Sequence, residues 1–284
     1  MRGIGKATIE LIAACRTVLE EIQPASVRAV CYKLFALGYI PDMSINSTNH
    51  ISRVLVRARE DGEIPWEHIV DGTRIGLRRM QWKDPNAFLE DAKSQYARDC
   101  WADQDYHVEL WSEKSTVEGV LESVWTDFGI TFRSFKGFSS ATVVKAIADV
   151  SAAIEKPFMA LYVGDWDPSG MYMSEVDLPA RLKRYGGQVE VVRIALLEDD
   201  THELPSFSTH SKRGDARYKH YLDRYGTRCW ELDAMNPNTL RERAELCIRG
   251  LIDPRKWSRM RWLETQEREI IRQYFDRRDF TPPH

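Results

Sequence analysis

The sequence has no long apolar segment of the kind that spans a membrane. None of its hydrophobic runs approaches the roughly eighteen consecutive apolar residues that a spanning helix needs. Residues 1–6 lead directly into an amphipathic helical pattern, where a secretory signal would carry a short apolar core. These absences exclude the membrane classes, and we expect a cytoplasmic protein with no membrane partner.

Cysteine is also scarce, and its spacing excludes two common uses. The five cysteines are scattered and never spaced as Cys-x-x-Cys: Cys15, Cys31, Cys100, Cys229 and Cys247. Neither a disulfide framework nor a zinc site is indicated, and we expect reduced thiols in the core. The sequence further lacks internal repeats, low-complexity tracts and a glycine-rich phosphate loop, so nothing in it indicates ATP hydrolysis.

Basic and acidic residues are nearly equal in number. The 40 basic and 43 acidic residues leave a net charge of −3, which excludes a protein attracted to nucleic acid over its whole surface. Local basic faces are compatible with this balance, because phosphate contacts need only a patch. The 284 residues, 43% of them hydrophobic, suffice for two domains with separate cores.

An apolar run that ends in two acids is the most informative feature present. Residues 158–164 read as a buried strand, and Asp165 and Asp167 follow directly, ahead of Pro168-Ser169-Gly170 and a new helical pattern. Side chains at i and i+2 of an extended chain point the same way, so both carboxylates can address one hard cation. Open α/β folds place their ligands at such carboxyl ends of parallel strands.

A second strand with the same design lies upstream. Residues 107–112 form a short apolar run that delivers Glu113 where a helix begins. Periodicity predicts helices over 115–125, 139–154 and 171–185, and further strands over 130–135 and 189–196. This alternation predicts an α/β fold with a Rossmann-like, right-handed parallel sheet and helices on both faces. An acid after the first strand and Asp-x-Asp after the third resembles the Toprim domain of topoisomerases, primases and some nucleases.

The N-terminal part predicts a module that reads DNA. Apolar spacing favours three helices, over residues 7–22, 27–35 and about 49–60. Residues 61–66 then read as a tight turn and a short wing. Three short helices and a wing are typical of DNA-binding domains. On the second helix, Arg28 and Tyr32 are i and i+4 neighbours that face the same side.

Basic residues near this module indicate where DNA would lie. The pattern leaves Arg53 and Arg57 on an exposed side of the third helix, and Arg74 follows the wing. We expect these three arginines to contact DNA phosphates.

A winged helix bearing Arg-x-x-x-Tyr ahead of a Toprim domain resembles the A subunit of topoisomerase VI and its relative that makes meiotic double-strand breaks. Arg28 and Tyr32 stand in the register of that family's arginine and DNA-attacking tyrosine, with Cys31 where the family often has a second aromatic residue. The family's Toprim acid matches Glu113, and its metal-binding aspartates match Asp165 and Asp167. The chain is shorter than usual for the family and looks more like the compact versions of phages and mobile elements.

The resemblance implies a topoisomerase-like DNA endonuclease that depends on Mg²⁺ or Mn²⁺. Tyr32 would attack the phosphodiester while Arg28 stabilises the developing charge. Glu113, Asp165 and Asp167 would hold the metal, and Glu113 or Lys114 would protonate the leaving sugar oxygen.

The same resemblance implies three partners. Double-stranded DNA would be the substrate, and the protein would be a homodimer in which the tyrosine of one subunit acts beside the metal of the other. A separate ATPase subunit would be needed for strand passage. In a prokaryote the protein would be associated with the nucleoid.

Interruptions of the periodic patterns divide the chain into four expected parts. These are a winged-helix domain over 1–82, a connecting helix or linker over 83–105, a Toprim domain over 106–230 and a helical C-terminal extension over 231–284. Glu231 and Asp233 repeat the i, i+2 acidic spacing; they either approach the metal site or lie in a plain loop, which we favour.

Two other functions are open at this point. One is a Toprim nuclease that hydrolyses DNA with metal-activated water, in which case Tyr32 only packs or contacts DNA. The other is a DNA-binding protein whose Toprim site is inert.

Overall fold

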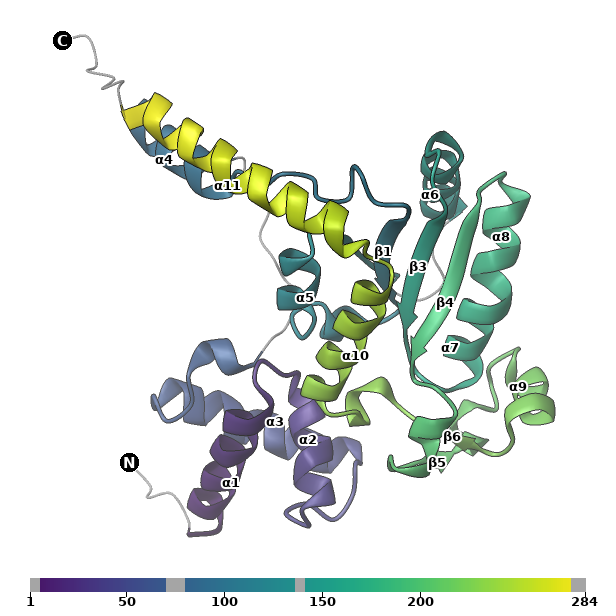
Figure 1. The fold of residues 1–284 in the computed structure, drawn as a ribbon. Coiled ribbons are helices and arrows are strands. Elements are labelled where there is room, and N and C mark those ends of the chain that lie inside the picture. The colour runs from purple at the N-terminus through teal and green to yellow at the C-terminus, as the bar shows by residue number, and fades with distance from the viewer. Residues whose placement is uncertain (1–5, 70–79, 136–140, 277–284) are drawn as a thin grey trace. The chain divides into compact units, whose positions relative to one another are not determined.

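The computed structural model describes residues 6–69, 80–135 and 141–276 of an α/β protein (Figure 1). Its chain divides into two units. The first combines residues 1–74 with 108–250, and the second combines residues 75–107 with 251–284. Within the described ranges, no helix has both the length and the apolar character needed to cross a membrane.

The first unit begins with three helices, α1 (Lys6–Ile22), α2 (Val27–Ala36) and α3 (Ile45–Glu60). The break between α1 and α2 ends at Ser26, whose side chain caps α2 by accepting a hydrogen bond from Ala29 N at 3.1 Å. The apolar faces of the three helices share one core, which includes Cys15, Leu19, Val30, Leu34, Ile51 and Leu55. The expected N-terminal helical region is confirmed.

Helix α3 starts earlier than its apolar pattern predicted. Ser44 caps it by accepting from Ser47 N, so the polar residues up to Asn49 form its first turn rather than a loop. The helix ends at a turn where Gly62 has a φ of 75°. Beyond it lie a short 3₁₀ helix, η1 (Trp66–His68), and a bridge between Ile69 and Ala25.

Four parallel strands form the sheet of the first unit. They are β1 (His107–Ser112), β2 (Thr131–Ser134), β3 (Phe158–Val163) and β4 (Val189–Ala195). The strand order is β2-β1-β3-β4, a Rossmann-like arrangement. Strands β1 and β3 are therefore neighbours, and both end at the same edge of the sheet.

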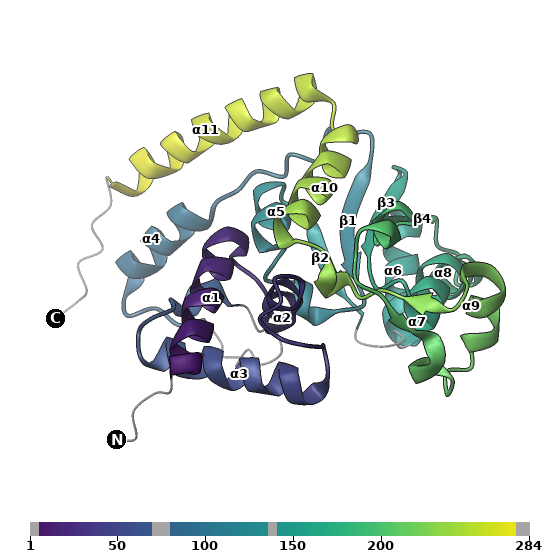
Figure 2. The same cartoon turned by 90° about the horizontal axis from the view of Figure 1, so that it is seen from below.

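Helices cover both faces of this sheet, as Figure 2 shows. Helices α6 (Ala141–Ala153) and α8 (Leu178–Arg184) pack against each other on one face. Helices α5 (Glu122–Asp127) and α10 (Pro237–Gly250) pack together on the other. Large side chains fill the α6 and α8 side, among them Trp111, Ile147, Phe158, Tyr162, Leu178 and Leu182. The expected parallel sheet flanked by helices is confirmed.

Short elements connect the sheet to the end of the first unit. They are η2 (Ser115–Val117), α7 (Pro168–Tyr172), the π-helical turn η3 (Met173–Asp177), η4 (Asp199–His202), β5 (Phe207–Ser208), η5 (Thr209–Lys212), α9 (Tyr218–Tyr225), β6 (Arg228–Cys229) and η6 (Leu232–Ala234). Strands β5 and β6 pair antiparallel. An isolated bridge between Trp166 and Trp230 then brings η6 beside the end of β3.

The second unit pairs two segments that are far apart in the sequence. Helix α4 (Pro85–Gln95) contacts α11 (Pro254–Asp276). Trp101 and Trp257 meet edge to face with ring centroids 5.6 Å apart, and Tyr96 Oη donates to Glu267 Oε2 at 2.6 Å. The expected connecting helix and the end of the C-terminal extension thus form one packed body.

Candidate functional site

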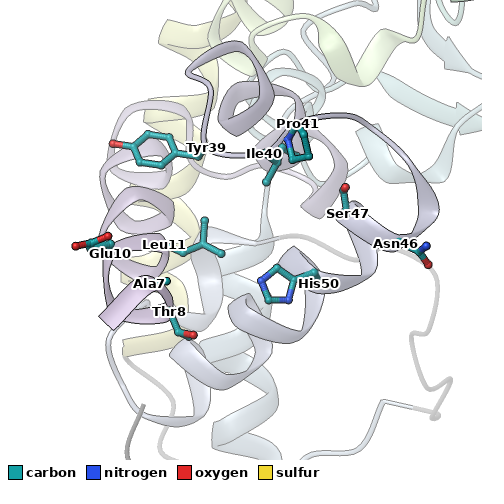
Figure 3. Close-up of a pocket in the computed structure, with 10 residues that line it drawn as sticks. All are labelled: Ala7, Thr8, Glu10, Leu11, Tyr39, Ile40, Pro41, Asn46, Ser47 and His50. Carbon is teal, nitrogen blue, oxygen red and sulfur yellow. The ribbon is translucent and has the colours of Figure 1, made fainter. Parts of the chain in front are cut away.

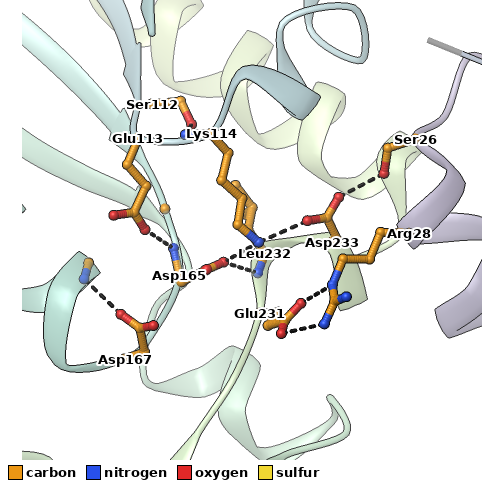
Figure 4. A network of polar contacts seen from close by, with 12 residues as sticks. Ser26, Arg28, Ser112, Glu113, Lys114, Asp165, Asp167, Glu231, Leu232 and Asp233 are labelled. Carbon is orange, nitrogen blue, oxygen red and sulfur yellow. Dashed lines mark hydrogen bonds and ion pairs between the residues drawn. The ribbon is translucent and has the colours of Figure 1, made fainter. Parts of the chain in front are cut away.

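Three carboxylates lie where two neighbouring strands end. Glu113 follows β1, and Asp165 and Asp167 follow β3 (Figure 4). Asp167 caps α7, because its Oδ1 accepts from Gly170 N at 2.8 Å. Glu113 Oε1 accepts from the backbone N–H of Asp165 at 3.1 Å, which ties the two strand ends together. We call these three side chains the acidic cluster, and the structure brings them together as the sequence predicted.

The acidic cluster is crowded and partly shielded from water. Burial, together with the charges of Asp165 and Asp167, raises the pKa of Glu113 to about 7. Burial also raises the pKa of Asp165 to about 6, although the nearby Lys114 opposes this change. Carboxylates that raise one another's pKa attract a compensating cation.

Two lysines provide compensating charge in this structure. Lys114 Nζ lies 2.8 Å from Asp165 Oδ1 and 2.8 Å from Asp233 Oδ2. Lys212 Nζ lies 3.0 Å from Asp167 Oδ2. Burial alone would lower the pKa of Lys114, but Asp165 and Asp233 raise it above its usual value. Lys114 is therefore a positive charge in contact with the acidic cluster.

The segment around η6 connects the acidic cluster to helix α2. Ser26 Oγ donates to Asp233 Oδ1 at 2.7 Å, and Arg28 makes a two-pronged ion pair with Glu231. Asp233 also binds Lys114, so the contacts run without a break from α2 to Asp165. We call Ser26, Arg28, Lys114, Glu231 and Asp233 the bridging network. The favoured interpretation of the acidic pair at 231 and 233 as a plain loop was wrong, because both side chains join this network.

Tyr32 lies on α2 close to this network but is buried. The residue is only 6% exposed, and the Arg28 guanidinium carbon lies 5.7 Å from the centroid of the Tyr32 ring. Burial and the charge of Glu231 raise the pKa of its hydroxyl above the usual value, while Arg28 lowers it. In this conformation burial of the side chain favours the protonated form of the hydroxyl.

The arginines expected to contact DNA have local partners. Arg53 Nε donates to Asn49 O at 3.3 Å, and Arg57 Nε lies 3.4 Å from Asp61 Oδ2. Both side chains are exposed on α3, on the side predicted from the sequence. Arg74 lies outside the described residues.

Arg193 supports the acidic cluster, and the sequence reasoning missed it. Its guanidinium donates to the backbone oxygens of Gly164 at 2.9 Å and Gly170 at 2.8 Å, and so holds the turn that carries both aspartates. The available signal was an arginine among the apolar residues Val191, Val192, Ile194 and Ala195 of strand β4. Gly170 allows the close approach, since a Cβ there would lie 2.3 Å from Asp165 O and 2.8 Å from Glu113 Oε1.

The acidic cluster offers the oxygen donors that Mg²⁺ prefers. As arranged here, however, no group of three or more His, Cys, Asp or Glu side chains among the described residues is set to hold a metal ion. Figure 4 shows the reason: the Asp165 carboxylate points toward Lys114 and Leu232 rather than toward Glu113. The donor chemistry fits a divalent cation, but Lys114 and Lys212 contact carboxylate oxygens of Asp165 and Asp167 that such a cation would use.

The helical region also contains a cavity of about 560 Å³ that is separate from the acidic cluster (Figure 3). Its walls come from α1, the loop at Tyr39 to Pro41 and the first turns of α3, and they include Glu10 and His50. No member of the acidic cluster or the bridging network lines it.

Comparison with known proteins gives no assignment. No protein-family model matches the chain, and neither does any curated protein. The geometry of the acidic cluster and its network is therefore the basis for a functional proposal.

Proposed function

We propose that the protein is a divalent-metal-dependent enzyme that breaks DNA strands, of the type of the topoisomerase VI A subunit. One observation carries the proposal. Glu113, Asp165 and Asp167 meet at one edge of a parallel sheet, and the bridging network links them to the helix that carries Arg28 and Tyr32. In this proposal the sheet domain is a Toprim domain and the N-terminal helices are a winged helix.

The acidic cluster would hold Mg²⁺ or Mn²⁺ through its carboxylate oxygens. A bound divalent cation would neutralise charge on the scissile phosphate. Lys114 and Lys212 now neutralise charge at Asp165 and Asp167, and if a cation displaced them they would be available to contact phosphate oxygens. The residues that compete with the metal thus become part of the substrate site.

The tyrosine route forms a bond between Tyr32 Oη and phosphorus and breaks the bond from phosphorus to the sugar oxygen. The phenolic proton passes to solvent, and Lys114 or protonated Glu113 donates a proton to the leaving oxygen. Arg28 stabilises the negative charge on the phosphate. The route requires Tyr32 to become exposed, and a homodimer would then present it to the acidic cluster of the partner.

The burial of Tyr32 favours a second candidate, in which water attacks instead. A shielded hydroxyl with a raised pKa is a poor nucleophile. Hydrolysis uses the same acidic cluster and needs no movement of α2. The two candidates share the substrate and differ in the attacking oxygen.

Duplex DNA is the proposed partner in both cases. Arg53 and Arg57 are exposed on α3 and would contact its phosphates. Strand passage would further require a separate ATPase subunit.

A cleavage assay tests the proposal. End-labelled duplex DNA is incubated with the protein and Mg²⁺ or Mn²⁺, then denatured with and without protease. Protein linked to a 5′ end supports the tyrosine route, and free ends support hydrolysis. Asp165→Ala should give no cleavage, whereas Asp149→Ala, which removes an exposed carboxylate from α6, serves as the matched control. Intact DNA under every condition would leave a DNA-binding protein with an inert site.

A further inference from the structure

A second cavity in the first unit has the chemistry of an anion site. It has a volume of about 460 Å³ and lies between α2, α3 and the segment after β1. We call it the α2–α3 groove. Its described lining contains two arginines, Arg28 and Arg59, and no carboxylate. The cavity of Figure 3 differs, because Glu10 lines it. Arginine is thus the only charged residue type in this described lining, although the net charge of the chain is −3.

One stripe of α3 supplies most of the polar wall. Thr48, Asn49, Ser52 and Arg59 all line the groove. Their spacing places them on the same side of the helix. Hydroxyl and amide side chains beside a guanidinium can donate several hydrogen bonds to one phosphate group.

Arg59 is the best-positioned cation of the groove. Its Nε donates to Leu55 O at 3.3 Å, and its guanidinium carbon lies 4.7 Å from the ring centroid of Trp66. These contacts orient the guanidinium plane, and neither of them uses a carboxylate. Arg28, by contrast, is engaged by Glu231.

The far wall of the groove includes Thr116, which lies next to the acidic cluster in the chain. Thr116 belongs to η2, directly after Glu113, Lys114 and Ser115. Its Oγ1 is buried and makes no hydrogen bond among the described residues. A buried hydroxyl without a partner has an unmet hydrogen-bonding demand, so Thr116 adds a polar group to the wall that no described residue satisfies.

We propose that the α2–α3 groove binds a phosphate of the DNA backbone and so guides the strand toward the acidic cluster. The inference rests on the proposed function and adds the place where substrate is held. Arg59 contacts the phosphate oxygens directly, and Asn49 and Ser52 donate to the same group. The groove borders the bridging network at Ser26 and Arg28, so the bound strand lies beside the path that leads to Lys114 and Asp165.

The test measures binding without cleavage. A fluorescently labelled duplex is titrated with protein in a chelator, and anisotropy is followed over a range of salt concentrations. Arg59→Ala should bind about tenfold more weakly, the loss expected for one charge-assisted hydrogen-bonded contact. The slope of log affinity against log salt should also fall by about one. The matched control is Arg16→Ala, which removes an exposed arginine from α1 and should bind like the parent.

A second variant guards against misfolding of the first. Ser52→Glu places a negative charge in the groove at a partly exposed position and should weaken binding further than Arg59→Ala. Parent-like binding by both groove variants would overturn the inference, and so would equal losses in Arg59→Ala and Arg16→Ala. A parent that binds no DNA in chelator also overturns it.

The outcome separates the inference from the proposed function. Cleavage by the parent with unchanged binding of Arg59→Ala rejects the groove and retains the enzyme. Arg59-dependent binding without cleavage retains the groove and rejects the enzyme.

Discussion

Replacing Lys114 by Met removes the positive charge that lies between Asp165 and Asp233. The ammonium is 2.8 Å from an oxygen of each carboxylate, and both aspartates are buried. Methionine keeps most of the side-chain volume, so the substitution changes charge more than packing. The variant therefore isolates the electrostatic role of Lys114.

The expected loss of stability follows from the burial of this pair. Removing one partner of a buried ion pair destabilises a protein by roughly 3–5 kcal/mol, because a charge is left without compensation. Asp165 keeps its hydrogen bond from Leu232 N at 2.7 Å, and Asp233 keeps the one from Ser26 at 2.7 Å. These remaining donors favour the lower end of the range, about 3 kcal/mol.

A divalent cation should restore much of what the substitution removes. A ligand present at about 100 times its dissociation constant stabilises the folded protein by about 2.7 kcal/mol. In the parent, Mg²⁺ would first have to displace Lys114 from Asp165, so its net stabilisation would be smaller. Mg²⁺ should consequently stabilise Lys114→Met more than the parent.

Urea unfolding followed by tryptophan fluorescence, with and without Mg²⁺, measures both effects. Lys145→Met is the matched control, since Lys145 pairs with Asp149 on the exposed face of α6 and such pairs contribute about 0.3–0.5 kcal/mol. A loss no larger than that of the control would refute the electrostatic role of Lys114. An equal effect of Mg²⁺ on parent and variant would refute competition between the lysine and the metal.

Three further predictions concern the proposed enzyme. Asp165→Ala or Asp167→Ala should abolish DNA cleavage while circular dichroism shows that the fold is retained. Cleavage that persists in both variants, or in excess chelator, would contradict the metal site. Replacing Arg53 and Arg57 together should weaken binding to all DNA sequences and reduce the salt dependence of the affinity, which fluorescence anisotropy measures. An unchanged slope of log affinity against log salt would show that the phosphate contacts lie elsewhere. Tyr32→Phe should bind duplex like the parent and form neither breaks nor covalent adducts, whereas normal cleavage by this variant establishes water as the nucleophile.

The features predicted from the sequence are those set by local pattern. Buried strands are recognisable as apolar runs, and in the helices between them apolar residues recur with a period of about 3.6 residues. Because the carboxyl ends of parallel strands share one edge, Glu113, Asp165 and Asp167 could be placed together before the structure was known. The start of α3 was misplaced because Ser44 and the polar residues after it look like a loop until the cap is recognised.

The bridging network could not be predicted, because its contacts join distant parts of the chain. Lys114 and Asp233 are separated by 119 residues, and Ser26 and Asp233 by 207. Periodicity reports which side of an element is apolar and gives no information on which loop lies opposite it. The same limit hid Arg193, whose partners are backbone oxygens of a turn 23 and 29 residues away.

In the proposed tyrosine route, the bridging network would couple the exposure of Tyr32 to the release of Asp165. If Tyr32 becomes exposed through a movement of α2, that movement would break the contacts of Ser26 with Asp233 and of Arg28 with Glu231. Asp233 would then lose its contact with Ser26 and would attract Lys114 more strongly, away from Asp165. In that proposal, Asp165 would become free to bind a cation when the tyrosine becomes available. Hydrolysis needs only the second of these changes, so a variant that loses the Arg28 to Glu231 pair should alter adduct formation more than it alters release of free DNA ends.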